Sequence, residues 1–258
     1  MDSFLLKLIF SFLVGGAYVA FIIRVSEKVE PKLAGILTGF PGTNVLSLIF
    51  LAWTNDANFA LAAMPIGPIG ISVNSIYLAI LLGLVKFGKF KALIASLAIW
   101  FALLLPFVFF NFNDFYLAIF LSIFIFALGL HLLSKFPVKT IKAQKLPKRE
   151  MILRCVLAGS LIAVSVLAGK FLGPLWGGLF ATFPAQFSSS VLLLTRTHGR
   201  EAAASVAKNI PYGSFSLIAF LVAFNFLVPH IGLLNGTVIS YGVAAIAAVL
   251  IYFEMKRK

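Results

Sequence analysis

Apolar runs of about 20 residues follow one another along this chain and are separated by short polar stretches. Nine of them are long enough to cross the hydrocarbon core of a bilayer, which takes ~20 apolar residues in a helix. They cover residues 4–23, 33–53, 59–85, 91–111, 114–134, 150–170, 175–195, 202–228 and 232–253. None shows the sustained alternation of apolar and polar residues that a membrane β-barrel strand requires. The pattern therefore predicts an all-α integral membrane protein with nine transmembrane helices.

A shift of 143 positions lays the first half of the chain on the second half without a gap. The matched pairs include Gly16 with Gly159, Pro31 with Pro174, Gly35 with Gly178, Phe40-Pro41 with Phe183-Pro184, Thr54 with Thr197, Pro68 with Pro211 and Gly70 with Gly213. Because Pro and Gly determine backbone shape, their shared register indicates two copies of one fold. We expect a first repeat at 1–111, with helices 1–4, and a second at 150–258, with helices 6–9. Residues 112–149 form a spacer helix and a basic linker.

Charge orients these helices. The chain has 21 Lys and Arg against 8 Asp and Glu, a net charge of +13. Most of the cations lie in connections on one side of the predicted helices, so we expect no nucleic-acid partner. The positive-inside rule makes that side cytoplasmic, with the N-terminus outside and the C-terminus inside. The basic linker sets this topology or contacts anionic lipid headgroups.

One spacer helix between two four-helix repeats makes the second repeat enter the membrane from the opposite face. The predicted architecture is therefore 4+1+4 inverted repeats. Transporters with inverted repeats bind substrate at the repeat interface near the bilayer midplane, between interrupted helices. A duplication retained for packing alone is the structural alternative.

Four of the predicted helices are interrupted at matching positions. Helix 2 carries Gly39-Phe40-Pro41-Gly42 and helix 7 carries Phe183-Pro184-Ala185. Helix 3 carries Pro65-Ile66-Gly67-Pro68-Ile69-Gly70 and helix 8 carries Lys208-Asn209-Ile210-Pro211-Tyr212-Gly213. A proline frees a backbone carbonyl, which in lipid needs a protein partner or a wet cavity. Paired interruptions of this kind indicate a transporter site. Pro and Gly are also common in transmembrane helices for packing reasons.

The polar residues at these interruptions are the candidate site. The expected substrate-binding residues are Pro41, Gly42, Thr43, Asn44, Asn74, Pro184, Gln186, Ser188, Lys208, Asn209 and Tyr212. Lys208 lies within a span, where it would attract an anion or extend to the cytoplasmic surface. No Asp or Glu lies deep in a span, which disfavours a buried carboxylate as proton relay and leaves sodium coupling open.

Enzyme chemistry has no support in the sequence. The three histidines do not cluster, and Cys155 is the single cysteine. No nucleophile–base pair and no Gly-rich phosphate loop is present. We therefore expect no catalytic residues, no metal site and no cofactor.

Short apolar motifs resemble a known family. Gly15-Gly16-Ala17-Tyr18, Leu33-Ala34-Gly35 and Phe40-Pro41-Gly42-Thr43 in the first half, with Gly177-Gly178-Leu179-Phe180 in the second, resemble small bacterial inner-membrane proteins of the GlpM type. The resemblance implies a tandem fused pair of four-helix units in a prokaryotic plasma (inner) membrane. The activity of that family is poorly defined, so the resemblance implies a fold more than a function and carries no catalytic residues.

The predicted function is secondary transport of a small anionic solute by alternating access between the repeats. Two alternatives stay open: a membrane scaffold or assembly factor for envelope synthesis, and a lipid-phosphate flippase with a lateral opening between helices. The expected partners are membrane lipids and a small-molecule substrate, and a homo-oligomer is compatible with each hypothesis.

Overall fold

The computed structural model describes residues 3–29, 31–40, 42–139 and 147–257. Its elements are α1 (Ser3–Ser26), α2 (Pro31–Gly39), α3 (Gly42–Thr54), α4 (Ala57–Ala62), α5 (Ile66–Leu84), η1 (Val85–Phe87), α6 (Lys89–Phe109), α7 (Phe115–Ser134), α8 (Lys148–Leu172), α9 (Pro174–Ala181), α10 (Ala185–His198), α11 (Arg200–Ala207), α12 (Ile210–Ile231) and α13 (Leu233–Arg257). No strand occurs within these ranges. The all-α class is confirmed for the described part of the chain.

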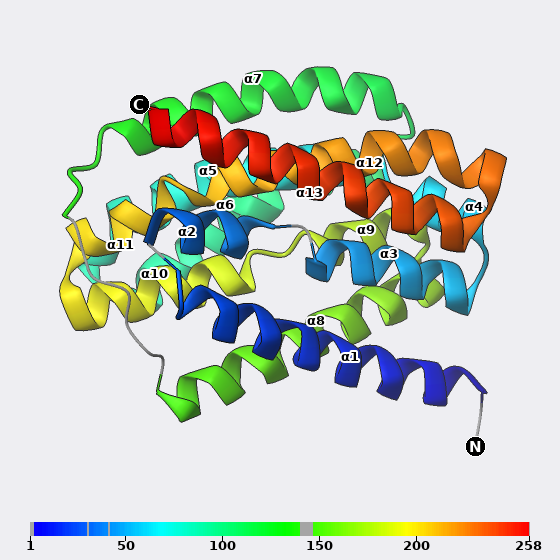
Figure 1. The fold of residues 1–258 in the computed structure, drawn as a ribbon, viewed down its shortest axis with the longest axis horizontal. Coiled ribbons are helices and arrows are strands. Elements are labelled where there is room, and N and C mark those ends of the chain that lie inside the picture. Colours follow the sequence, from blue (N-terminus) through cyan, green and yellow to red (C-terminus); the bar gives the residue numbers. More distant parts are fainter. Residues whose placement is uncertain (1–2, 30, 41, 140–146, 258) are drawn as a thin grey trace.

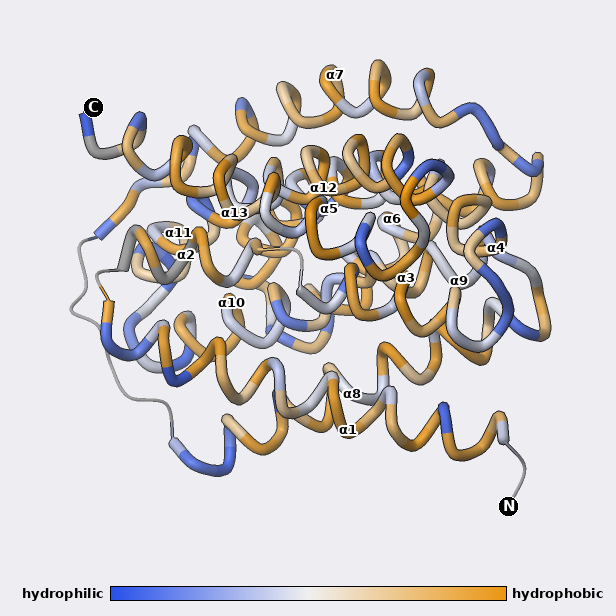
Figure 2. The backbone as a smooth tube through the Cα atoms, turned by 45° about the vertical axis from the view of Figure 1, so that its right-hand side comes forward, coloured by the Kyte–Doolittle hydropathy of each residue, from blue (hydrophilic) through white to orange (hydrophobic). Residues whose placement is uncertain are grey.

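Nine helical segments of the described chain are long and apolar enough to cross a membrane. They are Ser3–Ser26, Ile36–Thr54, Ala57–Phe87, Lys89–Phe109, Phe115–Ser134, Lys148–Leu172, Pro174–His198, Arg200–Ile231 and Leu233–Met255. The segments run roughly along the long axis of the molecule, with the two chain termini at opposite ends (Figure 1). Hydrophobic residues dominate the middle of the bundle, and hydrophilic ones gather at its two ends (Figure 2). The predicted multi-pass membrane protein is thereby confirmed.

Four spans are divided into two helices each, as the sequence predicts. The α2–α3 and α9–α10 pairs part near the middle of the molecule (Figure 1). In the third span the division falls at 63–65 and reaches Pro65, the first residue of the predicted interruption, so that Pro68 lies in the first turn of α5. Pro211 is likewise in the first turn of α12. A first-turn proline needs no backbone donor, so these prolines begin new helices rather than kink old ones.

The crossing of α1 and α8 contains two contacts that exchange places under the shift of 143 residues. A Cβ atom on Gly16 would lie 3.2 Å from the carbonyl oxygen of Cys155. A Cβ atom on Gly159, the match of Gly16, would overlap the carbonyl oxygen of Phe12, the match of Cys155. Glycine at both positions lets the two helix backbones approach closely, as small residues do between membrane helices.

A second reciprocal pair lies beside the divided helices. A Cβ atom on Gly70 of α5 would overlap Thr182, at the end of α9. The matching residues are Gly213 of α12 and Gly39 at the end of α2, where a Cβ on Gly213 would lie 3.0 Å from the Cα of Gly39. Each half therefore packs its own long helix against the interrupted helix of the other half.

The helix α5 forms the centre of the bundle. Its span is the most deeply buried of the nine, and its apolar side chains join the largest core cluster. The predicted spacer helix α7 packs against α5 through Gly129, which faces Ser75. The other side of α7 exposes Phe120, Ile123 and Phe124. This distribution suits a helix at the protein–lipid boundary.

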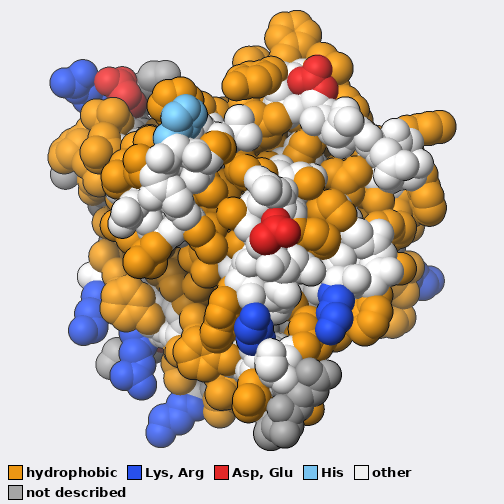
Figure 3. Space-filling model, turned by 90° about the vertical axis from the view of Figure 1, so that its right-hand side faces the viewer, with side chains coloured by type: hydrophobic (Ala, Val, Ile, Leu, Met, Phe, Trp, Pro, Cys, Tyr) orange, Lys and Arg blue, Asp and Glu red, His pale blue; other side chains and the backbone are white. Residues whose placement is uncertain are grey.

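The two ends of the bundle differ in charge. Figure 3 shows the end that carries the N-terminus, where a few acidic, basic and histidine side chains lie within a mainly hydrophobic outline. The cations of this end are Lys7, whose Nζ donates to the Trp53 carbonyl oxygen, and Lys170, which lies over the Phe4 ring. The helix ends and turns of the opposite end hold Arg24, Lys86, Lys89, Lys91, Lys135, Arg196, Arg200 and Arg257.

Candidate functional site

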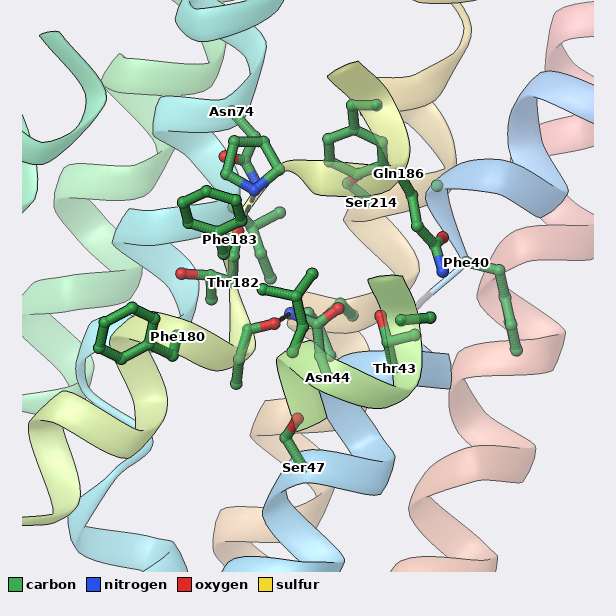
Figure 4. A pocket seen from close by; sticks show the side chains of 18 of the residues that line it. Phe40, Thr43, Asn44, Ser47, Asn74, Phe180, Thr182, Phe183, Gln186 and Ser214 are labelled. Carbon is green, nitrogen blue, oxygen red and sulfur yellow. Dashed lines mark hydrogen bonds between the residues drawn. The ribbon is translucent and has the colours of Figure 1, made fainter. Parts of the chain in front are cut away.

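A small cavity lies where the break between α2 and α3 meets the break between α9 and α10 (Figure 4). Its volume is about 30 Å³, which is room for one or two water molecules. The polar residues that line it come from both halves of the chain: Thr38, Thr43, Asn44, Ser47, Asn74, Thr182, Gln186 and Ser214. Phe40, Phe180, Phe183 and Phe187 supply aromatic walls. The cavity is therefore a small space between the two breaks, lined by uncharged polar and aromatic side chains.

Two asparagines of the first half hold the break of the second half. The Nδ2 atom of Asn44 in α3 donates to the Ala181 carbonyl oxygen at 2.8 Å. The Nδ2 atom of Asn74 in α5 donates to the Thr182 carbonyl oxygen at 2.9 Å. These carbonyls lie at the end of α9. Because the helix stops before Pro184, no backbone N–H group of a further helical turn is available to donate to them. The asparagines thus satisfy groups that would otherwise be unpaired within the membrane.

Asn74 is itself fixed from its other side. Its Oδ1 atom accepts a hydrogen bond of 2.7 Å from the indole Nε1 of Trp100, on α6. Trp100 is almost fully buried, and its ring contacts Phe183 edge to face. Both functional atoms of the Asn74 amide are therefore engaged, which fixes its orientation.

Two further predicted site residues line the cavity, and one of them has an unsatisfied group. Thr43 and Gln186 face it from the first turns of α3 and α10 (Figure 4). The Nε2 atom of Gln186 is buried without a hydrogen-bond partner. A buried donor with no partner in a native fold calls for an explanation, and a ligand in the cavity is one.

Other predicted residues lie next to the cavity with structural contacts. Pro184 lines the cavity at the start of α10. Ser188 bonds to the Tyr77 hydroxyl at 2.5 Å and to the Pro184 carbonyl oxygen, so it joins α10 to α5. Gly42 lies against the Tyr18 ring, where any Cβ would overlap it. Pro41 lies outside the described residues.

The structure does not bring Lys208, Asn209 or Tyr212 to this cavity. The Nζ atom of Lys208 donates to the Ser134 carbonyl oxygen at the end of α7, at 3.1 Å. The Nδ2 atom of Asn209 bonds back to the Ser205 carbonyl oxygen of its own helix. For Lys208, the geometry favours the alternative in which its side chain extends toward the basic end of the bundle.

A different intramembrane cation lies on the cavity side of the bundle. Arg154 belongs to α8, and it shares a helix face with Ala158 and Leu161, both of which line the cavity. Its Nε atom is buried without a hydrogen-bond partner. Sequence reasoning gave this residue no role, although an ionisable residue within a span is a signal for function in itself.

Electrostatically, the cavity combines the N-termini of two helices, α3 and α10, with the C-termini of two others, α2 and α9. No charged side chain lines it, and α3 and α10 both begin at its wall, at Gly42 and Ala185. The first backbone N–H groups of a helix have no partner within the helix and carry a partial positive charge. Within the described ranges, no group of three or more His, Cys, Asp or Glu could hold a metal ion.

Several residues of the site could not be singled out from the sequence. Thr38, Ser47 and Thr182 are single hydroxyls within apolar runs, whereas Ser214 directly follows the interruption at Pro211–Gly213. Trp100 lies in a span that has no proline or glycine break near it. The positions of Thr182, two residues before Pro184, and of Ser214, three residues after Pro211, gave usable signals.

Comparison with known proteins gives one match. A family described as Protein of unknown function (DUF3147) matches residues 151–257. No curated protein and no solved structure matches the chain. The match covers the second half of the chain and concerns an uncharacterised family, and it gives no support to the resemblance to GlpM-type proteins or to a tandem pair.

Proposed function

We propose that the protein is a secondary carrier, which moves a small anionic solute by alternating access between two inverted repeats. The observation that carries the proposal is the meeting of two helix N-termini, those of α3 and α10, at one polar cavity in the middle of the bundle. Carriers of several folds bind anionic groups at the N-termini of broken helices near the midplane.

The packing of the two halves supports an inverted-repeat arrangement of 4+1+4 helices. Under the shift of 143 residues, the Gly16–Cys155 contact becomes the Gly159–Phe12 contact. A two-fold axis between the halves requires this exchange. The axis would lie in the membrane plane, because α1 and α8 run in opposite directions (Figure 1). The repeats would be 1–111 and 150–258, with α7 as the spacer.

The charges around the cavity support an anionic solute. The cavity has no carboxylate, an unpaired amide donor at Gln186 and two helix N-termini. Arg154 would add a positive charge on the route from the basic end of the bundle. A guanidinium with a buried N–H that has no partner is stabilised when an anion pairs with it.

The small cavity volume supports a state of the transport cycle in which no solute is bound. A space of about 30 Å³ holds water or a dehydrated ion and excludes a metabolite. The solute would bind when the two halves rock apart about their shared crossing of α1 and α8. The described structure would then be the state that blocks leakage between the two sides.

The orientation follows from the charged ends. The basic end would face the cytoplasm of a prokaryotic cell, with the N-terminus outside. The anion would then reach Arg154 from the cytoplasmic side.

A thermal-shift screen tests the proposal. The purified protein is heated with a panel of small anionic metabolites, and Arg154→Gln and Arg154→Lys are measured alongside. A solute that binds the folded state at ~100 times its Kd adds ~2.7 kcal/mol of stability. We expect a dose-dependent rise in Tm that Arg154→Lys retains and Arg154→Gln loses, followed by uptake of the same solute into proteoliposomes. An absence of any shift, or of uptake, would favour the scaffold hypothesis.

A further inference from the structure

A second, larger hollow lies between α6, α8 and α10. Its volume is about 430 Å³. Its wall is mainly leucine and phenylalanine: Leu93, Leu97, Leu153, Leu157, Phe183, Leu192 and Leu193. The helix α6 packs chiefly against α5, and Leu153 and Leu157 of α8 are 49% and 36% exposed. The hollow is therefore a groove that opens sideways, between α6 and α8, toward the surrounding lipid.

The hydroxyl groups of the two serines in this groove are already engaged in hydrogen bonds. The Ser188 hydroxyl donates to the Pro184 carbonyl oxygen, and the Ser189 hydroxyl donates to the Gln186 carbonyl oxygen. Hydroxyls bonded back to their own helix leave an apolar surface. An apolar groove at membrane depth holds little water, since water needs two to four polar partners. In a bilayer, the groove would open onto the acyl chains of the surrounding lipids.

The length of the groove matches one leaflet. It extends along α10 from Ala185, at the mid-bundle break, to Arg196, near the end of the helix. Eleven residues at ~1.5 Å each give about 17 Å. Half of a ~30 Å hydrocarbon core is about 15 Å. A lipid chain that begins at the bilayer surface would therefore end near the break.

The rim of the groove carries the charges. Lys89 of α6, Arg196 of α10 and Glu150 of α8 lie at its outer end, and both cations are exposed. Among the described residues, neither cation forms an ion pair or a side-chain hydrogen bond. Two cations against one carboxylate leave a net positive rim at headgroup height, where basic residues attract anionic lipids.

We infer that this groove is a binding site for one anionic phospholipid, with an acyl chain between α6, α8 and α10 and the phosphate at Lys89 and Arg196. The apolar wall would contact the acyl chain, the length of the groove fits one leaflet, and the basic rim would bind the anionic headgroup. This site is separate from the carrier proposal and holds whether or not the protein moves a solute.

Native mass spectrometry of the full chain tests this site. The protein is placed in nanodiscs of dioleoyl phosphatidylglycerol or dioleoyl phosphatidylcholine and released, and retained lipid is counted. We expect one phosphatidylglycerol to persist and phosphatidylcholine to be lost. Neutralising one rim cation should lower retention about fivefold, and Lys89→Gln/Arg196→Gln about thirtyfold. The control Lys7→Gln/Lys170→Gln removes two cations at the other end and should change nothing.

A blocking variant tests the chain part of the site. Leu157→Trp fills the groove and leaves the rim intact, so it should also release the lipid. Equal retention of both lipids by the unmodified protein would overturn the headgroup assignment without any variant. Retention unchanged in Leu157→Trp, with a normal elution profile, would overturn the groove as the location.

Discussion

Asn74 and Thr182, which lie 108 residues apart in the chain, are joined by a hydrogen bond of 2.9 Å across the two halves of the molecule. The bond ties the centre of α5 to the break between α9 and α10. Trp100 holds the asparagine from its other side. The site therefore depends on a buried amide that is fixed at both its oxygen and its nitrogen.

The first prediction concerns this amide. Asn74→Leu removes the partner of the Thr182 carbonyl oxygen and of the Trp100 indole N–H, so two buried groups lose their hydrogen bonds. We expect the free energy of unfolding to fall by about 1–2 kcal/mol, as for interhelical bonds at the stronger end in membranes. Reversible unfolding in mixed micelles measures this. The control is Asn55→Leu, at the exposed end of α3, and an equal loss there would contradict the prediction.

A second prediction concerns the contact of α2 with α12. A Cβ on Gly39 would overlap the Ile210 carbonyl oxygen, and one on Gly213 would overlap that of Ile36. Both obstacles are backbone, so Gly213→Ala must push the helices apart, and we expect a loss of about 1–3 kcal/mol.

Gly242→Ala is the matched control, because a Cβ there meets nothing within 4 Å. Alanine in place of a helical glycine should be neutral or stabilising by up to about 1 kcal/mol. Comparable Tm losses in the two variants would show that the α2–α12 contact is not the cause.

A third prediction separates the two intramembrane cations. Lys208 bonds to the Ser134 carbonyl oxygen, whereas Arg154 shares a helix face with residues of the cavity wall. We therefore expect Arg154→Gln to weaken anion binding at least tenfold and Lys208→Gln to leave it within twofold. Titration of the Tm shift with the anion found in the screen measures both. The reverse order would return the role to Lys208.

A fourth prediction concerns water access to the cavity. In a Cys155→Ser background, cysteines at Thr43 and Gln186 should react with a polar thiol reagent in a carrier, because opening of either half hydrates the breaks. Bound solute should slow the reaction. A cysteine at Ser96, which is fully buried in α6, is the control for labelling of dry positions. Silence at Thr43 and Gln186 under all conditions would favour a scaffold.

The sequence was sufficient for the coarse fold because long apolar runs determine membrane spans by length alone. Prolines at 41, 68, 184 and 211 also located the divided helices, since a proline restricts the backbone wherever it stands. In the third span the division lies at Ala63–Pro65, at the start of the predicted Pro65–Gly70 stretch, because Pro68 is tolerated in the first turn of α5. The assignment of domains and of helix orientation in the membrane stays a prediction.

The site was only partly predictable, because a linear pattern does not say which way a side chain points. Thr43, Asn44, Asn74 and Gln186 were found through their proximity to the breaks. Lys208 is at a similar sequence distance from a break, yet its side chain reaches the end of α7. The bond from Trp100 to Asn74 joins two helices whose relative rotation no single-sequence periodicity determines.

The crossing of α1 and α8 has a consequence for how such a protein is made. The crossing has paired contacts, with Gly16 on one side and Gly159 on the other. Two separate copies of a half-length chain could form the same contacts only if they inserted into the membrane in opposite directions. A half-length chain would have to be indifferent to its own direction of insertion, with little charge bias between its two ends. Under the proposed inverted-repeat arrangement, fusion through α7 would remove that requirement, because one ribosome would deliver both halves in equal number and each half could carry the charges that commit it to a single direction.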